Sequence, residues 1–146
     1  MAAKHAEKAF TGEGAYLAGG RWNSKGNRMV YTASTLSLAA LEILVHAEFP
    51  EIRLEYVSIP VEIGKEYIQK LPEARWPRDW QSEPAPLSAR KLGDDWLLSG
   101  HSAVLEVPSK IIPAEKNYLI NPLHPDFGKL WIGKKNKFSF DSRLVR

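Results

Sequence analysis

The chain has 146 residues, of which 44% are hydrophobic and 25% charged, so it fits one globular domain and not a disordered, collagen-like or coiled-coil protein. It contains no cysteine, which excludes disulfides, Cys-ligated zinc, iron–sulfur clusters and thiol catalysis. The net charge of +3 is too small to indicate nucleic acid, although residues 128–146 hold six Lys or Arg against one Asp. We interpret that basic stretch first as a solvated face, and we expect no direct nucleic-acid partner because no RNA-binding signature accompanies it.

No segment approaches the roughly 20 apolar residues that a transmembrane helix needs. The first eight residues, MAAKHAEK, lack the apolar stretch of a signal peptide. We therefore expect a cytoplasmic protein without a membrane partner.

In the first half of the chain, the glycine-rich residues 10–28 are expected to form a loop. Met29–Ala33 is rich in β-branched and aromatic residues and predicts a strand. Ser34 or Thr35 can cap a helix that runs to about Glu48, just before Pro50.

The second half predicts short strands, turns and one more helix. Residues 72–86, rich in Trp and Pro, are expected to form an ordered loop, and residues 87–99 a helix that Gly100 ends. Strands are expected at 54–61, 102–108, 117–121, 130–132 and 137–140. Because strands and helices do not alternate strictly, we predict a single α+β domain, residues 1–146, with mixed sheets and two main helices.

Glu42 is the most informative residue, because it is the only charge between Thr35 and Val45 on an otherwise apolar helix. Such a helix is typical of a buried element, and a lone carboxylate there is costly unless it is paired. Glu42 is therefore either a structural partner of His46 or of an arginine, or a carboxylate directed into a cleft.

Arg21 lies among glycines in GGRWNSKG, residues 19–26, where its guanidinium could bind phosphate oxygens with two parallel hydrogen bonds. The segment lacks the strand–turn–helix context of a dinucleotide fingerprint and is not a P-loop. The structural alternative is a hairpin with residues 23–27 as its turn. In one register of that hairpin Arg21 shares a face with Tyr31.

Other signals are weak. Residues 100–104 begin like the nucleophile elbow of a serine hydrolase but lack its second glycine. His124 and Asp126 in a Pro-rich turn are more typical of structure than of a metal site.

Four parts of the chain, in order and covering nearly all of it, resemble the RES domain, the toxin half of a bacterial toxin–antitoxin system. They are AFTGEGA with GGRWNSKG, VYTAS with LAALEILVH, SAVLEVPS, and NYLINPLHPDF. This family usually begins with a short strand before the first of these segments, and that strand is mostly missing here. The resemblance implies a fold like that of ADP-ribosyltransferases.

The family is named for an Arg, a Glu and a Ser. Arg21 and Glu42 match the first two, Ser102 is the better match to the serine, and Ser109 is its rival. Tyr31 matches a further site residue of the family.

The resemblance also implies that NAD⁺ is a substrate and not a bound cofactor, and that no metal is needed. The partner it implies is an Xre-type helix-turn-helix antitoxin, with a toxin homodimer as one form of their complex. Family members destroy NAD⁺ by hydrolysis or phosphorolysis, or modify a protein.

The residue types fit that chemistry. Breaking the nicotinamide–ribose bond builds positive charge on the ribose, which a carboxylate such as Glu42 stabilises. Arg21 could hold the diphosphate, Tyr31 could stack on nicotinamide, and Ser102 could bind a ribose or phosphate oxygen. Two other functions stay open: a non-enzymatic binding module with a buried Glu42–Arg21 pair, and an RNase-type toxin, which the lack of a convincing His–base pair disfavours.

Overall fold

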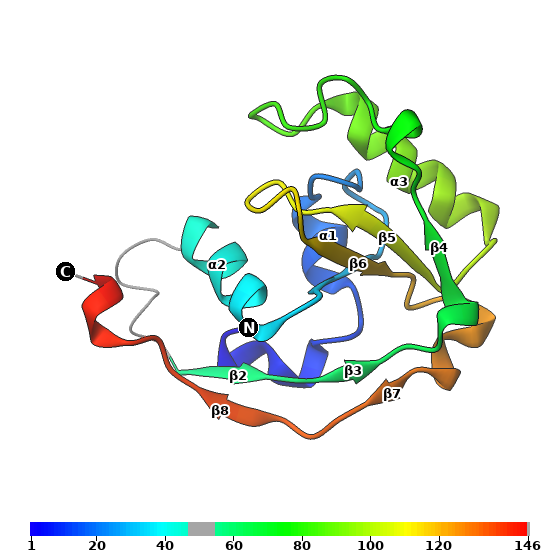
Figure 1. Ribbon diagram of the computed structural model, residues 1–146. Helices are drawn as coiled ribbons and strands as arrows, with labels where there is room; N and C mark the ends of the chain where they lie inside the picture. The colour runs from blue at the N-terminus through cyan, green and yellow to red at the C-terminus, as the bar shows by residue number, and fades with distance from the viewer. Residues whose placement is uncertain (47–54, 146) are drawn as a thin grey trace.

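The computed structural model describes residues 1–46 and 55–145 (Figure 1). Its α-helices are α1 (Glu13–Ala18), α2 (Leu36–His46) and α3 (Leu87–Ser99). Its strands are β1 (Val30–Ala33), β2 (Tyr56–Ser58), β3 (Val61–Glu62), β4 (Ile68–Lys70), β5 (Val104–Pro108), β6 (Lys116–Ile120), β7 (Trp131–Ile132) and β8 (Asn136–Phe138). Short 3-10 helices cover Ala3–Lys8, Lys65–Tyr67, Glu73–Arg75, Pro125–Lys129 and Ser142–Val145. The predicted α+β class with two main helices, α2 and α3, is confirmed.

Four strands form the central sheet in the order β1-β6-β5-β4, and β4 and β5 are parallel while the other pairs are antiparallel. Two further antiparallel pairs, β2 with β8 and β3 with β7, follow one another as a long ribbon along one side of the molecule (Figure 1). The helix α3 lies on the other side of the central sheet from this ribbon (Figure 1).

The central strand β5 is buried on both faces, which agrees with a sequence that is apolar except for the partly exposed Glu106. Successive residues point to opposite faces, so Val104 and Leu105 enter two different clusters. Leu105 packs with Trp22 and with Trp96 of α3. Val104 packs with Ile120 and with residues of the ribbon side. Burial of both faces therefore makes the sheet the rigid centre from which the loops at its ends extend.

Two predicted helix boundaries are confirmed, the start of α2 and the end of α3. Thr35 caps α2 by accepting a hydrogen bond from the Leu38 N–H at 3.1 Å. Gly100 follows α3 in a left-handed conformation, with φ of 59°. The predicted end of the first helix near Glu48, and Leu54 at the start of the next predicted strand, lie outside the described residues.

Two predictions about local structure are wrong. α2 is not a buried helix: only Leu38 is buried, whereas Leu36, Leu41 and Val45 are exposed. The hairpin across residues 21–31 does not form either, because β1 pairs with β6 and the preceding segment is a loop without a strand.

Several short elements were not predicted, among them the 3-10 helix near the N-terminus, α1 and β4. α1 has six residues, one of them Gly14, and β4 has three. Both are too short for a repeating pattern of apolar residues to be recognised in the sequence. The first residues also pair with β2, where the Val57 N–H donates to the Met1 carbonyl at 2.9 Å. Of the helices in the described parts of the chain, none is long and apolar enough to cross a membrane.

Candidate active site

A cavity of about 1030 Å³ lies between β1, α2, the loop before β1 and the connections that flank α3 and β5. Its walls include Arg21, Tyr31 and Glu42, three of the four residues predicted for the site, but not Ser102. We call it the Glu42 pocket. A second cavity of about 1040 Å³ shares Tyr31 but contains neither Arg21 nor Glu42. The predicted chemistry therefore converges on the Glu42 pocket.

The Glu42 carboxylate is held by two neutral hydrogen-bond donors. Its Oε1 accepts from the Ser109 Oγ at 3.0 Å and from the Asn117 Nδ2 at 2.7 Å. Among the described residues neither His46 nor any arginine pairs with it. The structural alternative, an ion pair of Glu42 with His46 or an arginine, is therefore not formed among the described residues, where neutral donors fix one carboxylate oxygen.

Ser109 is fully buried directly after β5, where it also orders the chain that follows. Its Oγ accepts hydrogen bonds from the backbone N–H groups of Ile111 and Ile112 at 3.1 and 3.2 Å. With these donors in place, the hydroxyl proton is directed to Glu42. Asn117 on β6 lies opposite Val107 on β5, so Asn117 and Ser109 lie at the same end of this antiparallel strand pair, and both donate to the carboxylate.

The hydroxyl and the ring of Tyr31 lie in different surroundings. Its hydroxyl accepts a hydrogen bond from the Trp22 N–H at 3.1 Å and donates one to the Asn23 Oδ1 at 2.7 Å. Burial raises the pKa of this hydroxyl well above its ordinary value, which keeps it protonated as the donor. The residue as a whole is 40% exposed, so the ring presents open surface to the pocket while its tip is anchored.

The loop before β1 is held by buried polar contacts. The Asn23 Nδ2 donates to the carbonyls of Ala15 and Asn27 at 3.0 and 3.1 Å, and Asn23 is fully buried. From α3, the Asp94 Oδ1 accepts from the Ser24 N–H at 3.0 Å and from the Asn27 Nδ2 at 2.7 Å. This loop is therefore a fixed scaffold under Tyr31.

Two glycines permit the close approaches in this scaffold. A Cβ on Gly20 would lie 2.4 Å from the Tyr31 hydroxyl oxygen, so no side chain fits beneath the tyrosine. A Cβ on Gly93 would lie 1.8 Å from the Trp22 carbonyl oxygen, so α3 packs directly on the loop backbone.

Arg21 uses its guanidinium differently from the prediction. Its Nη1 donates to the carbonyls of Trp80 and Ser82 at 2.8 and 3.0 Å, and its Nη2 donates to the Glu83 Oε2 at 2.8 Å. Arg21 therefore ties residues 80–83 to the pocket wall. The ion pair of the binding-module hypothesis, Glu42 with Arg21, is not formed because Glu83 is the carboxylate that Arg21 contacts.

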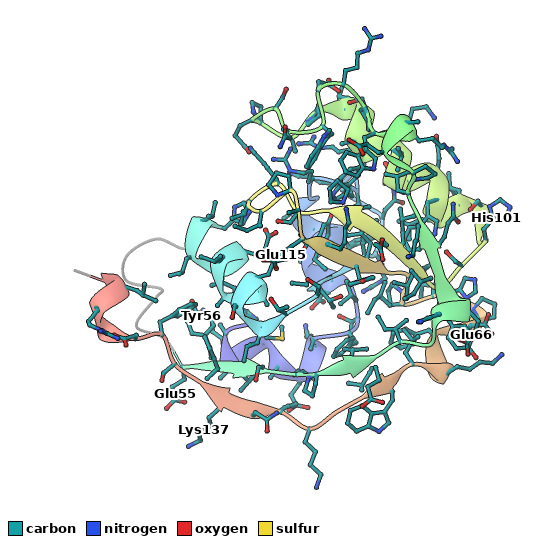
Figure 2. All side chains as sticks on the ribbon, in the orientation of Figure 1. Glu55, Tyr56, Glu66, His101, Glu115 and Lys137 are labelled. Atoms are coloured by element: carbon teal, nitrogen blue, oxygen red, sulfur yellow. The ribbon has the colours of Figure 1, made fainter. Side chains whose placement is uncertain are left out.

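Ser102 lies in the core and away from the Glu42 pocket. Its Oγ accepts from the Trp96 Nε1 at 2.9 Å and donates to the Val104 carbonyl at 2.9 Å. Its neighbour His101 lies on the loop after α3, on the opposite side of the molecule from α2 (Figure 2). Of the two serines that match the family, the structure brings Ser109 to Glu42 and places Ser102 elsewhere.

Of the described residues in the basic stretch after residue 128, none contributes to the walls of the pocket. Lys129 and Lys135 pair with Asp126 and Glu7, and Lys137 lies on the outer strand β8 (Figure 2). His124 is a structural residue: its Nδ1 accepts from the Asp126 N–H at 3.0 Å and caps the turn.

Sequence patterns alone did not single out Asn117, Arg90 and Lys110, which also line the pocket. Alternation along β6 could have placed Asn117 on the face of Leu119, and hence of Tyr31 opposite it. Arg90 lies in the predicted helix 87–99, but the helix pattern does not show which of its faces borders a pocket. Lys110 lies in the turn after β5, for which no periodicity predicts a direction.

Comparison with known proteins identifies the family of the chain. A family model described as the RES domain matches residues 2–141. The chain belongs to the RES domain family. Its relatives include a protein named "Toxin Res" from Yersinia enterocolitica, 40% identical over 142 residues, which are 97% of this chain and 93% of the relative. A second relative, from Sphingobium sp., is named "Prs ADP-ribosylating toxin" and is 37% identical over 140 residues, 94% of this chain and 87% of the relative.

Among solved structures, this RES domain is similar to a chain in the crystal structure of the M. tuberculosis MbcT-MbcA toxin–antitoxin complex. The TM-score is 0.69 and the identity 18%, over 88% of this chain and 76% of the other. At that identity the similarity concerns the fold, and it agrees with the α+β domain described above.

Proposed function

We propose that this RES domain is the toxin of a toxin–antitoxin system and that it consumes NAD⁺ by cleaving the nicotinamide–ribose bond. The observation that carries the proposal is the Glu42 carboxylate, fixed at a pocket wall by two neutral donors. Cleavage of this bond develops positive charge on the ribose, and an immobilised negative charge stabilises that transition state more than the ground state.

The other pocket residues support NAD⁺ as the substrate. The ring of Tyr31 is partly exposed while its hydroxyl is anchored, which suits a flat surface for the nicotinamide ring. With a volume of about 1030 Å³, the pocket lies at the upper end of the range for small-molecule sites, as a dinucleotide requires.

For the family serine we propose Ser109 and not Ser102. The Ser109 hydroxyl donates a hydrogen bond to Glu42 and orients the carboxylate, whereas both hydrogen bonds of Ser102 are made within the core. Ser109 is a positioning residue in this scheme, because its hydroxyl acts through Glu42.

The proposed partner is an Xre-type helix-turn-helix antitoxin that covers the mouth of the Glu42 pocket. Support comes from the solved toxin–antitoxin complex of similar fold and from the three exposed apolar side chains of α2, Leu36, Leu41 and Val45. Exposed apolar surface beside a site is typical of a surface that a protein partner covers.

The test is to incubate the purified protein with NAD⁺, with and without inorganic phosphate, and to identify the products by mass. ADP-ribose in both reactions identifies hydrolysis, and ADP-ribose phosphate in the second identifies phosphorolysis. Expression of the chain alone in bacteria should arrest growth and lower cellular NAD⁺. A folded protein that leaves NAD⁺ intact under all these conditions would contradict the proposal.

A second candidate is transfer of ADP-ribose to a protein, favoured by the name of the Sphingobium relative. The chemistry at Glu42 is the same and only the acceptor differs. Labelled NAD⁺ in a bacterial lysate separates the two: a labelled protein band identifies a transferase, and soluble ADP-ribose products identify NAD⁺ destruction.

A further inference from the structure

Three cationic side chains line one wall of the Glu42 pocket: Arg21, Arg90 and Lys110. They come from three separate parts of the chain, the loop before β1, the first turn of α3 and the turn after β5. The wall also carries one carboxylate, Glu83, which accepts hydrogen bonds from both Arg21 and Lys110. Positive charge therefore exceeds negative charge on this side of the pocket.

Arg90 is the cation without a partner in this group. Its Nε is buried and makes no hydrogen bond in the described structure, and no ion pair or side-chain hydrogen bond joins its guanidinium to any described residue. Burial raises the pKa of the nearby Tyr31 hydroxyl, and the charges of Arg21 and Arg90 both oppose that effect. Arg21, Arg90 and Tyr31 all line the Glu42 pocket. A half-buried guanidinium without a counter-ion is a ready partner for an anion that enters the pocket.

Glu83 occupies the position that such an anion would take. One of its oxygens, Oε2, contacts both the Arg21 Nη2 and the Lys110 Nζ, as a phosphate oxygen between two cations does. The hydrogen bond from Lys110 lowers the pKa of Glu83, so this group is an anion at neutral pH. The Glu83 carboxylate therefore lies where the cations Arg21 and Lys110 favour a negative charge.

We infer that Arg21, Arg90 and Lys110 form an anion-binding subsite, and that a phosphate or diphosphate group of a ligand takes the place of the Glu83 carboxylate there. Glu83 would then act as a built-in competitor that sets how tightly the anion binds.

The contacts allow such an exchange. The Glu83 side chain is 67% exposed, whereas those of Arg21 and Lys110 are 15% and 31% exposed. Ion pairs of exposed side chains contribute little to stability, so the carboxylate can leave without loss of the fold. Arg21 stays in place when Glu83 leaves, because Trp80 and Ser82 still hold its Nη1.

The experiment is calorimetric titration of the purified protein with inorganic diphosphate and, separately, inorganic phosphate. Glu83→Gln removes the negative charge at nearly constant shape, and we expect it to tighten diphosphate binding about tenfold. Arg90→Gln and Lys110→Gln should each weaken binding about tenfold or more, because each removes one of the cations.

A matched control is available on α3, where Lys91 and Asp95 form an exposed ion pair at 2.7 Å that does not line the pocket. Asp95→Asn changes the net charge as Glu83→Gln does, and Lys91→Gln changes it as the two cation variants do. Both controls should bind diphosphate like the original protein. If Glu83→Gln binds no more tightly than Asp95→Asn, or if Arg90→Gln binds as well as Lys91→Gln while circular dichroism shows both folded, the inference is wrong.

The source of the anion is decided by competition with ADP-ribose. If the subsite takes the diphosphate of a dinucleotide, ADP-ribose displaces inorganic diphosphate. If the subsite takes free phosphate, ADP-ribose and inorganic diphosphate bind to the protein at the same time. This inference does not depend on catalysis, since binding is measured without NAD⁺ cleavage. A protein that binds diphosphate in the expected order but leaves NAD⁺ intact would support the subsite and contradict the proposed function.

Discussion

The two ends of β5 each carry a buried serine, and the two serines do different things. Before the strand, Ser102 joins the Trp96 indole to the Val104 carbonyl inside the core. After the strand, Ser109 donates to the Glu42 carboxylate at a pocket wall. Burial is nearly the same, 9% and 0% exposed, so burial alone does not tell a structural serine from a site serine.

The partners make the difference. All hydrogen bonds of Ser102 connect parts of the fold that would otherwise carry unsatisfied polar groups, which is a contribution to stability. Ser109 satisfies backbone groups as well, but its hydroxyl donates a hydrogen bond to the Glu42 carboxylate, which has no cationic partner in the part of the chain that the structure describes. The loss of the hydroxyl should therefore lower stability at both ends of β5, but it should lower turnover at the Ser109 end alone.

Glu42→Gln should show the largest effect on turnover. The amide keeps the shape and an acceptor oxygen for Ser109 and Asn117 but removes the charge. We expect NAD⁺ turnover to fall at least about 100-fold, with a change in the free energy of unfolding of no more than about 1 kcal/mol. Urea unfolding and NAD⁺ kinetics on the same preparation check both numbers. A folded variant with full activity would refute a catalytic role for Glu42.

Gly20→Ala should displace Tyr31 without touching Glu42. The new Cβ would lie 2.4 Å from the Tyr31 hydroxyl oxygen and 2.9 Å from the Asn23 Oδ1, so the tyrosine must shift. Since misplacement of a positioning group by about 1 Å can cost up to about 100-fold, we expect kcat/KM for NAD⁺ to fall about 10- to 100-fold. Gly14→Ala is the control, because no atom lies within 4 Å of its new Cβ, and it should leave kcat/KM unchanged.

Ser109→Ala removes the hydrogen bond that orients Glu42 from the end of β5. A hydrogen bond to a charged group contributes about 1.5–3 kcal/mol, so turnover should fall about tenfold or somewhat more. Because the hydroxyl acts through Glu42, kcat should fall more than KM rises. If the variant with both Glu42→Gln and Ser109→Ala loses as much turnover as Glu42→Gln alone, both changes remove the same interaction. If the two losses of turnover multiply, the residues do not share a role.

Ser102→Ala should have the smallest effect on turnover and a clear effect on stability. The Trp96 N–H and the Val104 carbonyl would each lose a partner in the core. A buried group left without its partner costs about 1–3 kcal/mol, which urea unfolding measures directly. Turnover per folded molecule should stay within about twofold of the original protein. A large loss of turnover would return the catalytic role to this serine.

The sequence predicted the elements whose signals are local. Thr35 predicted the start of α2 and Gly100 the end of α3, because capping depends on a few neighbouring atoms. Apolar runs gave the central strands. The burial of α2 was wrong because a helix without a polar face can be buried or can remain exposed, and composition does not distinguish the two.

The site was predictable in part. Arg21, Tyr31 and Glu42 do line one pocket, but the contacts that fix Arg21 and Glu42 come from residues 59 to 75 positions away in the chain. The choice between the two serines depended on which end of β5 faces α2, which is a property of the sheet topology. The partner of Arg21, Glu83, lies in a Pro-rich loop whose path no local pattern gives.

The most direct test is nicotinamide release from NAD⁺ by Ser102→Ala and Ser109→Ala, measured side by side at a temperature where circular dichroism shows both to be folded. Chemistry at the Glu42 end of β5 predicts that Ser102→Ala keeps the original rate and that Ser109→Ala loses about tenfold, the equivalent of one oriented hydrogen bond. The reverse order, with Ser109→Ala at the original rate and Ser102→Ala impaired although folded, would contradict the assignment of the active site to the Glu42 pocket.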